Sequence, residues 1–306
     1  MAAGRGSGRR VVTLLPAATE IVATLGGIGS LVGVSHECDY PPAVGGIPRI
    51  TTTPIDPAAS ALVIDAEVRR LRSEGRPVIA VDGPALRRLA PDLVVTQGLC
   101  EVCAVADGEV HRLAAALDPP PEIISLSATT LAGIWLDIRR VGAALDLAAD
   151  ADEIVLGLQS RLARLARARR GARPPRVACV EWLEPLYLAG HWVPELIEAA
   201  GGIDVGATAG SHSTRRTWGE VEALRPDVIL VALCGFGVER SCRDLEGFTN
   251  PDGCRVLEGA KVWVVDGNAY TSRPGPRVVD GAERIRAALE GREAPGLRRW
   301  QPVQAA

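Results

Sequence analysis

The chain has 306 residues, enough for one large domain or two ordinary ones. Its composition is 47% hydrophobic and 23% charged, which is ordinary for a soluble globular protein. The net charge of −3 gives no reason to expect nucleic acid binding. No apolar run is long enough to span a bilayer, so membrane insertion is not expected.

Residues 1–10 are polar and flexible in character and contain no apolar segment. As written, the chain therefore lacks a signal peptide, and it predicts a cytoplasmic location. A periplasmic or extracellular location would follow only from a true start further upstream. The seven cysteines are odd in number and favour reduced thiols over a disulfide framework.

The first part of the chain alternates strands with helices. Apolar runs without polar alternation, such as residues 93–95, suit parallel strands covered on both faces. The expected strands are 11–15, 31–34, 77–81, 93–97 and 122–126, and the expected helices are 19–25, 55–74, 86–89 and 109–117.

A long helical region from 130 to about 170, with a break between 146 and 152, carries apolar residues at helical spacing. After it the pattern restarts. The expected strands are 176–180, 226–233 and 261–266, and the expected helices are 193–200, 218–224 and 281–289. The run of seven arginines from Arg161 to Arg176 is interpreted as a solvated helix end leading into a linker, in preference to a nucleic-acid patch.

The two halves repeat a pattern. Residues 89–95 match 224–230 around a Pro-Asp pair, and each half has a helix stopped by Gly-Gly, at Gly26-Gly27 and at Gly201-Gly202. We therefore predict an α/β fold of two lobes, each a mainly parallel sheet flanked by helices, joined by a long helix, with a ligand cleft between the lobes. The boundaries are a disordered 1–10, an N-terminal lobe 11–128, a connecting helical region 129–172, a C-terminal lobe 173–290 and a loose tail 291–306.

Chemically distinctive residues follow the strands. Because ligands bind beyond the carboxyl ends of strands in open parallel α/β sheets, these residues are the candidate ligand contacts. They are His36, Glu37, Gln97, Glu181, Trp182, His191, Trp192 and Phe236. Trp182, Trp192 and Trp218 could form flat walls for a large ring ligand, or they could simply pack.

His36, Cys38, Cys100 and Cys103 form a plausible tetrahedral set for Zn or Fe. The alternative is that Cys100 and Cys103 pack at a helix start as small hydrophobes. A redox-active Cys-x-x-Cys is a third interpretation, weakened by the carboxylate of Glu101 between the thiols. Cys179, Cys242 and Cys254 are expected to be inert.

The chain resembles the helical-backbone class of periplasmic binding proteins, in particular the vitamin B12 and iron-siderophore group. The resemblance covers about residues 11–290. The residues that carry it are Val11 to Glu20, Gly33-Val34-Ser35, Asp39-Tyr40-Pro41-Pro42 and the two Pro-Asp strand starts. Within that group, His36-Glu37-Cys38, residues 97–103, Glu181-Trp182 and Arg273 to Arg277 resemble a subgroup usually called cobalamin-binding proteins.

The resemblance implies a binding protein, not an enzyme, that holds cobalamin or a related corrinoid or metal chelate. It also implies that Arg273 is a ligand contact. The chain departs from the importers at their permease-docking glutamates, where it has Pro84 and Gly219; only the neighbouring Glu220 could substitute. An ABC permease partner is therefore doubtful. The competing hypothesis is a metal- or thiol-dependent enzyme, or a metal sensor, that uses His36, Cys38, Cys100 and Cys103.

Overall fold

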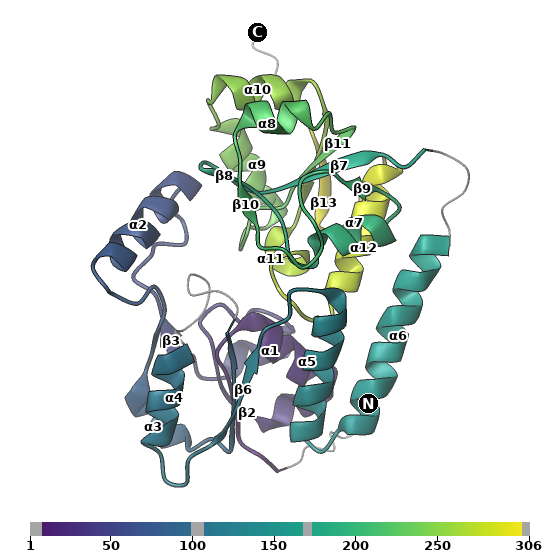
Figure 1. The fold of residues 1–306 in the computed structure, drawn as a ribbon. Helices are drawn as coiled ribbons and strands as arrows, with labels where there is room; N and C mark the ends of the chain where they lie inside the picture. The colour runs from purple at the N-terminus through teal and green to yellow at the C-terminus, as the bar shows by residue number, and fades with distance from the viewer. Residues whose placement is uncertain (1–7, 99–106, 168–172, 302–306) are drawn as a thin grey trace. The chain divides into compact units, whose positions relative to one another are not determined.

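The computed structural model describes residues 8–98, 107–167 and 173–301. Within them the chain forms two compact α/β units (Figure 1). The first unit takes the described residues within 1–59, 63–128 and 132–156, and the second takes those within 60–62, 129–131 and 157–306.

The first unit is built on a four-stranded sheet in the order β2-β1-β5-β6, parallel throughout. Its strands are β1 (Val11–Thr13), β2 (Leu31–Val34), β5 (Leu93–Gln97) and β6 (Glu122–Leu126). The prediction of buried parallel strands is confirmed, because Leu93, Val94 and Val95 have no solvent exposure. The strands expected at 11–15 and 77–81 are shorter in the structure, which has Val11–Thr13 and Ala80–Val81 there.

Helices and short elements complete this unit. They are α1 (Pro16–Thr24), η1 (Gly27–Ser30), η2 (Pro42–Gly46), α2 (Ala61–Ser73), α3 (Gly83–Leu89), α4 (Asp107–Ala115), α5 (Leu131–Ala144) and the two-stranded sheet of β3 (Thr51–Thr52) with β4 (Ala80–Val81). Helices α2, α3 and α4 supply Leu71, Leu86 and Val110 to a core shared with Val12 and Val94 of the sheet.

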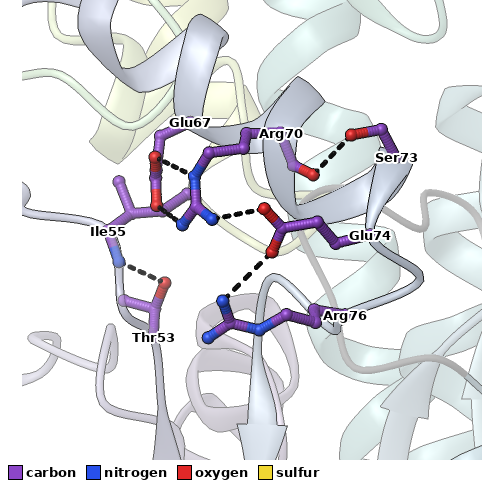
Figure 2. A network of polar contacts seen from close by, with 7 residues as sticks. All are labelled: Thr53, Ile55, Glu67, Arg70, Ser73, Glu74 and Arg76. Atoms are coloured by element: carbon purple, nitrogen blue, oxygen red, sulfur yellow. Dashed lines mark hydrogen bonds and ion pairs between the residues drawn. The ribbon is translucent and has the colours of Figure 1, made fainter.

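Helix α2 carries its charges on an exposed face. Arg70 bonds to Glu67 through two nitrogens, at 2.9 and 2.5 Å, and to Glu74 at 2.6 Å; Arg76 bonds to Glu74 at 3.2 Å (Figure 2). Hydrogen bonds from Arg70 lower the pKa of both glutamates. Because these pairs are solvent-exposed, they contribute little to stability.

Helix α6 (Ala148–Arg167) carries the chain into the second unit. The sheet there has the order β10-β8-β7-β11-β12-β13, with β9 also paired to β7. Its strands are β7 (Arg176–Leu183), β8 (Leu186–Leu188), β9 (Ile203–Asp204), β10 (Thr214–Arg215), β11 (Val228–Val231), β12 (Lys261–Val265) and β13 (Leu297–Trp300). Its helices are α7 (Val193–Ala199), α8 (Trp218–Ala223), α9 (Val238–Glu246), α10 (Pro251–Glu258), α11 (Gly267–Tyr270) and α12 (Val278–Leu289).

Two differences from the sequence-based expectation concern the edges of this sheet. Strand β7 continues past the expected end and turns back as β8, antiparallel to it. The tail from residue 291, expected to be loose, includes β13, which pairs antiparallel with β12 and buries Leu297. The correction has a simple reason: backbone pairing to an open sheet edge leaves little trace in a short sequence such as residues 297–300.

The predicted duplication is visible in the strand pairing. Strand β1 pairs β5 with Val11 opposite Leu93, and β7 pairs β11 with Val177 opposite Val228, both parallel. The chain reverses after α1 at Gly26 (φ 81°) and after α7 at Gly201 (φ 96°). Both glycines take a left-handed conformation that side chains disfavour, which explains the two Gly-Gly stops.

Candidate ligand-binding site

The carboxyl end of β2 carries a small hydrogen-bond network around His36. The hydroxyl of Thr51 lies 2.7 Å from His36 Nδ1, accepts from the His36 backbone N–H at 2.9 Å and lies 3.0 Å from Ser35 Oγ. Burial, and secondarily the positive charge of Arg49, lower the pKa of His36. The ring is half-buried and neutral at pH 7, so it can act as a hydrogen-bond partner or a ligand to a metal.

The thiol of Cys38 contacts a different group from the His36 ring. It is 1% exposed, and its Sγ lies 3.0 Å from the hydroxyl of Thr19, which lies 2.6 Å from the hydroxyl of Thr13. This chain of polar groups joins the end of β2 to the β1–α1 corner beneath the sheet edge. His36 and Cys38 therefore have separate hydrogen-bond partners, although only one residue separates them in sequence.

The predicted metal set is only partly within the described residues. Cys100 and Cys103 lie outside them. Among the residues that the structure describes, no group of three or more His, Cys, Asp or Glu side chains is placed to hold a metal ion. The His36, Cys38, Cys100 and Cys103 site therefore stays a prediction.

Gln97 and Glu37 occupy the same edge of the first sheet. Gln97 is the last residue of β5, opposite Leu126 of β6, and is partly buried. Glu37 is exposed after β2. The loop after β6 is held by the buried carboxylate of Asp137, whose Oδ2 accepts from the backbone N–H groups of residues 127 and 128, both at 3.2 Å. Burial raises the pKa of Asp137.

In the second unit, the ends of β7 and β11 bring an aromatic pair together. The rings of Trp182 and Phe236 lie 5.5 Å apart at 48°, and the guanidinium of Arg240 lies 4.6 Å above the Phe236 ring. The backbone N–H of Cys234 donates to the Glu181 carbonyl at 3.1 Å, which fixes these two strand ends side by side. Aromatic faces with an adjacent cation are suited to a flat ring ligand with polar substituents.

The segment after β12 adds a buried arginine to the same edge. Arg273 is only 5% exposed and donates to Asn268 Oδ1 at 2.7 Å. The backbone N–H of Asn268 donates to the Phe236 carbonyl at 3.1 Å, and that of Gly235 donates to Ser272 Oγ at 3.4 Å. The structure thus joins Glu181, Trp182, Phe236 and Arg273 into one region at the carboxyl ends of three parallel strands.

His191 and Trp192 belong to a different part of this unit. They follow β8, which runs antiparallel to β7 and so leads back towards the amino end of β7. The N–H of Ala189, just after β8, donates to the carbonyl of Cys179 in the middle of β7. His191 and Trp192 therefore do not lie at the carboxyl end of that strand. His191 contacts His212, with Nε2 and Nδ1 3.3 Å apart, and the rings of His191 and Trp192 lie 5.7 Å apart. Trp218, the third proposed flat wall, is buried against Phe248 at 5.5 Å, as simple packing predicts.

Sequence reasoning did not select Thr51, Asn268, Arg240 or His212. Thr51 and Asn268 are ordinary polar residues whose importance comes from the partners the fold brings to them. Arg240 lies in α9, which was not expected because its sequence is strongly charged with few apolar positions. His212 lies shortly before β10. A search for residues that follow strands therefore does not find it.

None of the helices within the described part of the chain is both long and apolar enough to cross a bilayer. Neither a search against protein-family models nor a search of curated proteins finds a match to the chain.

Solved structures do match, and they define the class of fold. The chain has the fold of the periplasmic binding proteins that carry heme, vitamin B12 or iron compounds, which confirms the fold resemblance drawn from the sequence. A periplasmic heme-binding protein from Pseudomonas aeruginosa is 19% identical, with a TM-score of 0.72, and the match covers 97% of this chain and 99% of that one.

Two further structures show the range of ligands in this fold. The heme-binding protein RhuT from Roseiflexus sp. RS-1 is 22% identical with a TM-score of 0.67, and the match covers 92% of this chain and 98% of that one. The vitamin B12-binding protein BtuF of Vibrio cholerae is 18% identical with a TM-score of 0.65, and the match covers 92% of this chain and 96% of that one. Both neighbours are described as binding proteins.

The prediction of a cytoplasmic location is wrong. The neighbours of this fold are described as periplasmic proteins. The error arose because the prediction relied on the first ten residues of the chain as written, and the start of a sequence is a weak basis for a location.

Proposed function

We propose that the protein is a substrate-binding protein for a flat, metal-centred macrocycle, either cobalamin or a related corrinoid or tetrapyrrole chelate. The observation that carries the proposal is the cluster of Trp182, Phe236 and buried Arg273 at the carboxyl edge of the second sheet. On the first sheet, His36 and Gln97 would supply the complementary contacts.

The chemistry of the cluster fits this class of ligand. The apolar face of a macrocycle gains by covering aromatic rings, which contribute about 0.5–1.5 kcal/mol per ring pair beyond the area they bury. Carboxylate, amide or phosphate groups at the rim of the macrocycle suit a guanidinium that is already positioned by Asn268. A macrocycle that is bound and released unchanged needs only ring stacking and polar contacts of this kind.

We further propose that the protein works outside the cytoplasm and delivers its ligand to an ABC permease. Two fold neighbours are described as periplasmic, and a third, from Listeria monocytogenes, is described as an ABC transporter substrate-binding protein. The docking contact would differ from the importers. Glu220 is held by its own helix cap, because its Oε2 accepts from the Thr217 N–H at 2.7 Å and lies 2.9 Å from the Thr217 hydroxyl. Pro84 carries no charge, so a permease partner would use other residues on the first unit.

The test is an absorbance titration of the full chain with hydroxocobalamin and, separately, with hemin. We expect a saturable spectral change with one of them at micromolar concentrations. Trp182→Ala and Arg273→Met should weaken it, and His36→Ala should reduce the spectral change. The matched control is Trp300→Ala, because Trp300 pairs with Val262 near the amino end of β12 and should not affect binding.

Absence of binding to either macrocycle at micromolar protein and ligand would contradict the proposal. If the Trp182→Ala and Trp300→Ala proteins bound the macrocycle with equal affinity, the ligand would bind elsewhere than at the proposed site. Mass and absorbance analysis of material that co-purifies with the protein would identify the chelate directly.

A further inference from the structure

We propose that His191 and His212 form a binding site for a first-row transition metal ion such as Ni²⁺ or Zn²⁺, separate from the proposed macrocycle site. The two rings meet edge to face, with centroids 5.2 Å apart at 89°. His191 Nε2 and His212 Nδ1 lie 3.3 Å apart. These are two of only four histidines in the chain.

The spacing between the two nitrogens matches that of neighbouring ligands on a metal. Two imidazole nitrogens, each about 2.0–2.1 Å from a tetrahedral Zn²⁺, lie roughly 3.3–3.4 Å from each other. A small rotation of the rings would turn the two lone pairs from each other towards a shared ion. The hydrogen now between the nitrogens would move to the remote nitrogen of its own ring, or to water if one ring is protonated.

The backbone holds the two histidines together. The His191 N–H donates to the Ser211 carbonyl at 2.6 Å, and the Gly210 N–H donates to the His191 carbonyl at 2.8 Å. Gly190 is required here, because a Cβ atom at this position would lie 2.4 Å from the Ser211 carbonyl oxygen. His191 itself has φ 54°, a left-handed conformation that costs energy for a histidine.

The surroundings keep both rings able to bind a cation. Burial, and then the proximity of His212, lower the pKa of His191, so the ring is neutral and its nitrogens are available. Trp192 packs beside His191 and is 4% exposed, whereas His212 is exposed and leaves one side of the pair open to solvent. Within the described residues, no third side chain completes a closed site. The ion would therefore keep open positions for water or another donor.

The experiment uses the untagged full chain, stripped of metal by a chelator, and NiCl₂ or ZnCl₂ as the probe in isothermal titration calorimetry. We expect one ion per chain. His191→Asn and His212→Ala should each weaken binding more than about tenfold, because even loss of an outer partner of a metal ligand costs about 10–100-fold. Asparagine is chosen at 191 because it tolerates the left-handed conformation better than alanine.

The controls use the two remaining histidines. His111→Ala removes an exposed imidazole from α4 and should leave the affinity unchanged. His36→Ala should also leave it unchanged; if that variant alone lost the metal, the ion would belong to the predicted His36 and cysteine set and the proposal would be overturned. Circular dichroism of each variant identifies any loss of folding.

Nitrogen-15 NMR of the imidazoles supplies a readout that a structural role would not move. Added Zn²⁺ should shift the resonances of His191 Nε2 and His212 Nδ1, and leave those of His111 in place. An absence of heat and of these shifts at millimolar Zn²⁺ would contradict the proposal. Since neither probe is a macrocycle, the result is independent of whether cobalamin or hemin binds.

Discussion

Arg176 and Asp227 form a reciprocal pair at the start of the second parallel sheet. The Arg176 N–H donates to Asp227 Oδ2 at 2.7 Å, and the Asp227 N–H donates to the Arg176 carbonyl at 2.8 Å. The Arg176 side chain donates at 2.7 Å to the carbonyl of Leu224, at the end of α8. The pair thus ties the first residue of β7 to the turn that leads into β11.

The same arrangement occurs in the first unit. The Arg10 N–H donates to Asp92 Oδ2 at 2.7 Å, the Asp92 N–H donates to the Arg10 carbonyl at 2.8 Å, and the Arg10 side chain donates to the Leu89 carbonyl at 2.7 Å. Ala90 and Arg225, which precede the two Pro-Asp pairs, both have positive φ, at 38° and 47°. The Pro-Asp repeat in the sequence therefore marks a duplicated structural unit down to individual hydrogen bonds.

We expect Asp227→Ala and Asp92→Ala each to lower the free energy of unfolding by about 0.5–1.5 kcal/mol, the net contribution of an ordinary hydrogen bond. Both aspartates are exposed, so larger losses are not expected. Urea denaturation followed by circular dichroism measures the change. Asp118→Ala, at an exposed aspartate before β6, is the matched control, and equal losses in all three variants would show that the aspartate pairing is not what stabilises the strand starts.

The duplication was the part of the fold most readily predicted, because short-range signals carry it. Apolar runs, Pro-Asp strand starts and Gly-Gly helix stops each act over fewer than ten residues, and they appear twice. Strands β8, β9 and β10 were missed because each has only two or three residues. Strand β8 forms a hairpin with β7, whereas β9 and β10 pair with β7 and β8, which are distant in sequence from them. Backbone pairing of this kind depends on neighbours that a local pattern does not contain.

The sequence indicated which residues belong to candidate sites better than it indicated which of them lie together. Trp182 and Phe236 meet because β7 and β11 are parallel neighbours, as the general rule for such sheets indicates. Arg273, which follows the neighbouring β12, is linked to Phe236 through Asn268. His191 was placed with them because it follows a loop after β7. The intervening β8 reverses the chain and brings His191 to His212 instead. No strong sequence signal marks that hairpin.

We expect Thr19→Val to destabilise the protein by about 1–3 kcal/mol, because it leaves buried polar groups without their partner. The Thr19 hydroxyl lies between the Thr13 hydroxyl and Cys38 Sγ, and all three residues are at most 1% exposed. Valine has nearly the same shape, so a loss reports on hydrogen bonding and not on packing. Thr19→Ser keeps the hydroxyl and should cost less; a valine variant as stable as the wild type would show that the network contributes nothing.

Arg161 joins the end of α6 to α12 within the second unit. Its guanidinium contacts Asp280 at 2.5 Å and Glu283 at 2.8 Å, and each side chain is about a third exposed. We expect Arg161→Met to lower the free energy of unfolding by roughly 0.5–1 kcal/mol, since screened ion pairs contribute little. The difference should shrink in 1 M NaCl, where the Debye length is about 3 Å. A difference that persists undiminished at high salt would assign the effect to packing of the arginine stem.

Asp204, the last residue of β9, should make stability depend on pH. Burial raises its pKa to about 6, against the opposing hydrogen bonds that its Oδ1 accepts from the N–H groups of Ala207 and Gly206, at 2.8 and 2.7 Å. Its Oδ2 is buried with no hydrogen-bond partner among the described residues. In the unfolded chain the group ionises near its ordinary value of about 3.9.

Between about pH 4 and pH 6 the folded protein therefore holds a proton that the unfolded chain has released, so this group's contribution to stability falls as pH rises through that window. A shift of about two pKa units corresponds to a loss on the order of 2–3 kcal/mol by pH 7. Asp204→Asn keeps an acceptor for the Gly206 and Ala207 N–H groups but cannot ionise. We expect its stability relative to wild type to improve by that amount between pH 4 and pH 7, measured as urea midpoints across the range. Asp118→Asn, at an exposed aspartate, should show no such change, and a parallel pH profile for wild type and Asp204→Asn would mean that the folded-state carboxyl of Asp204 ionises at its ordinary pKa.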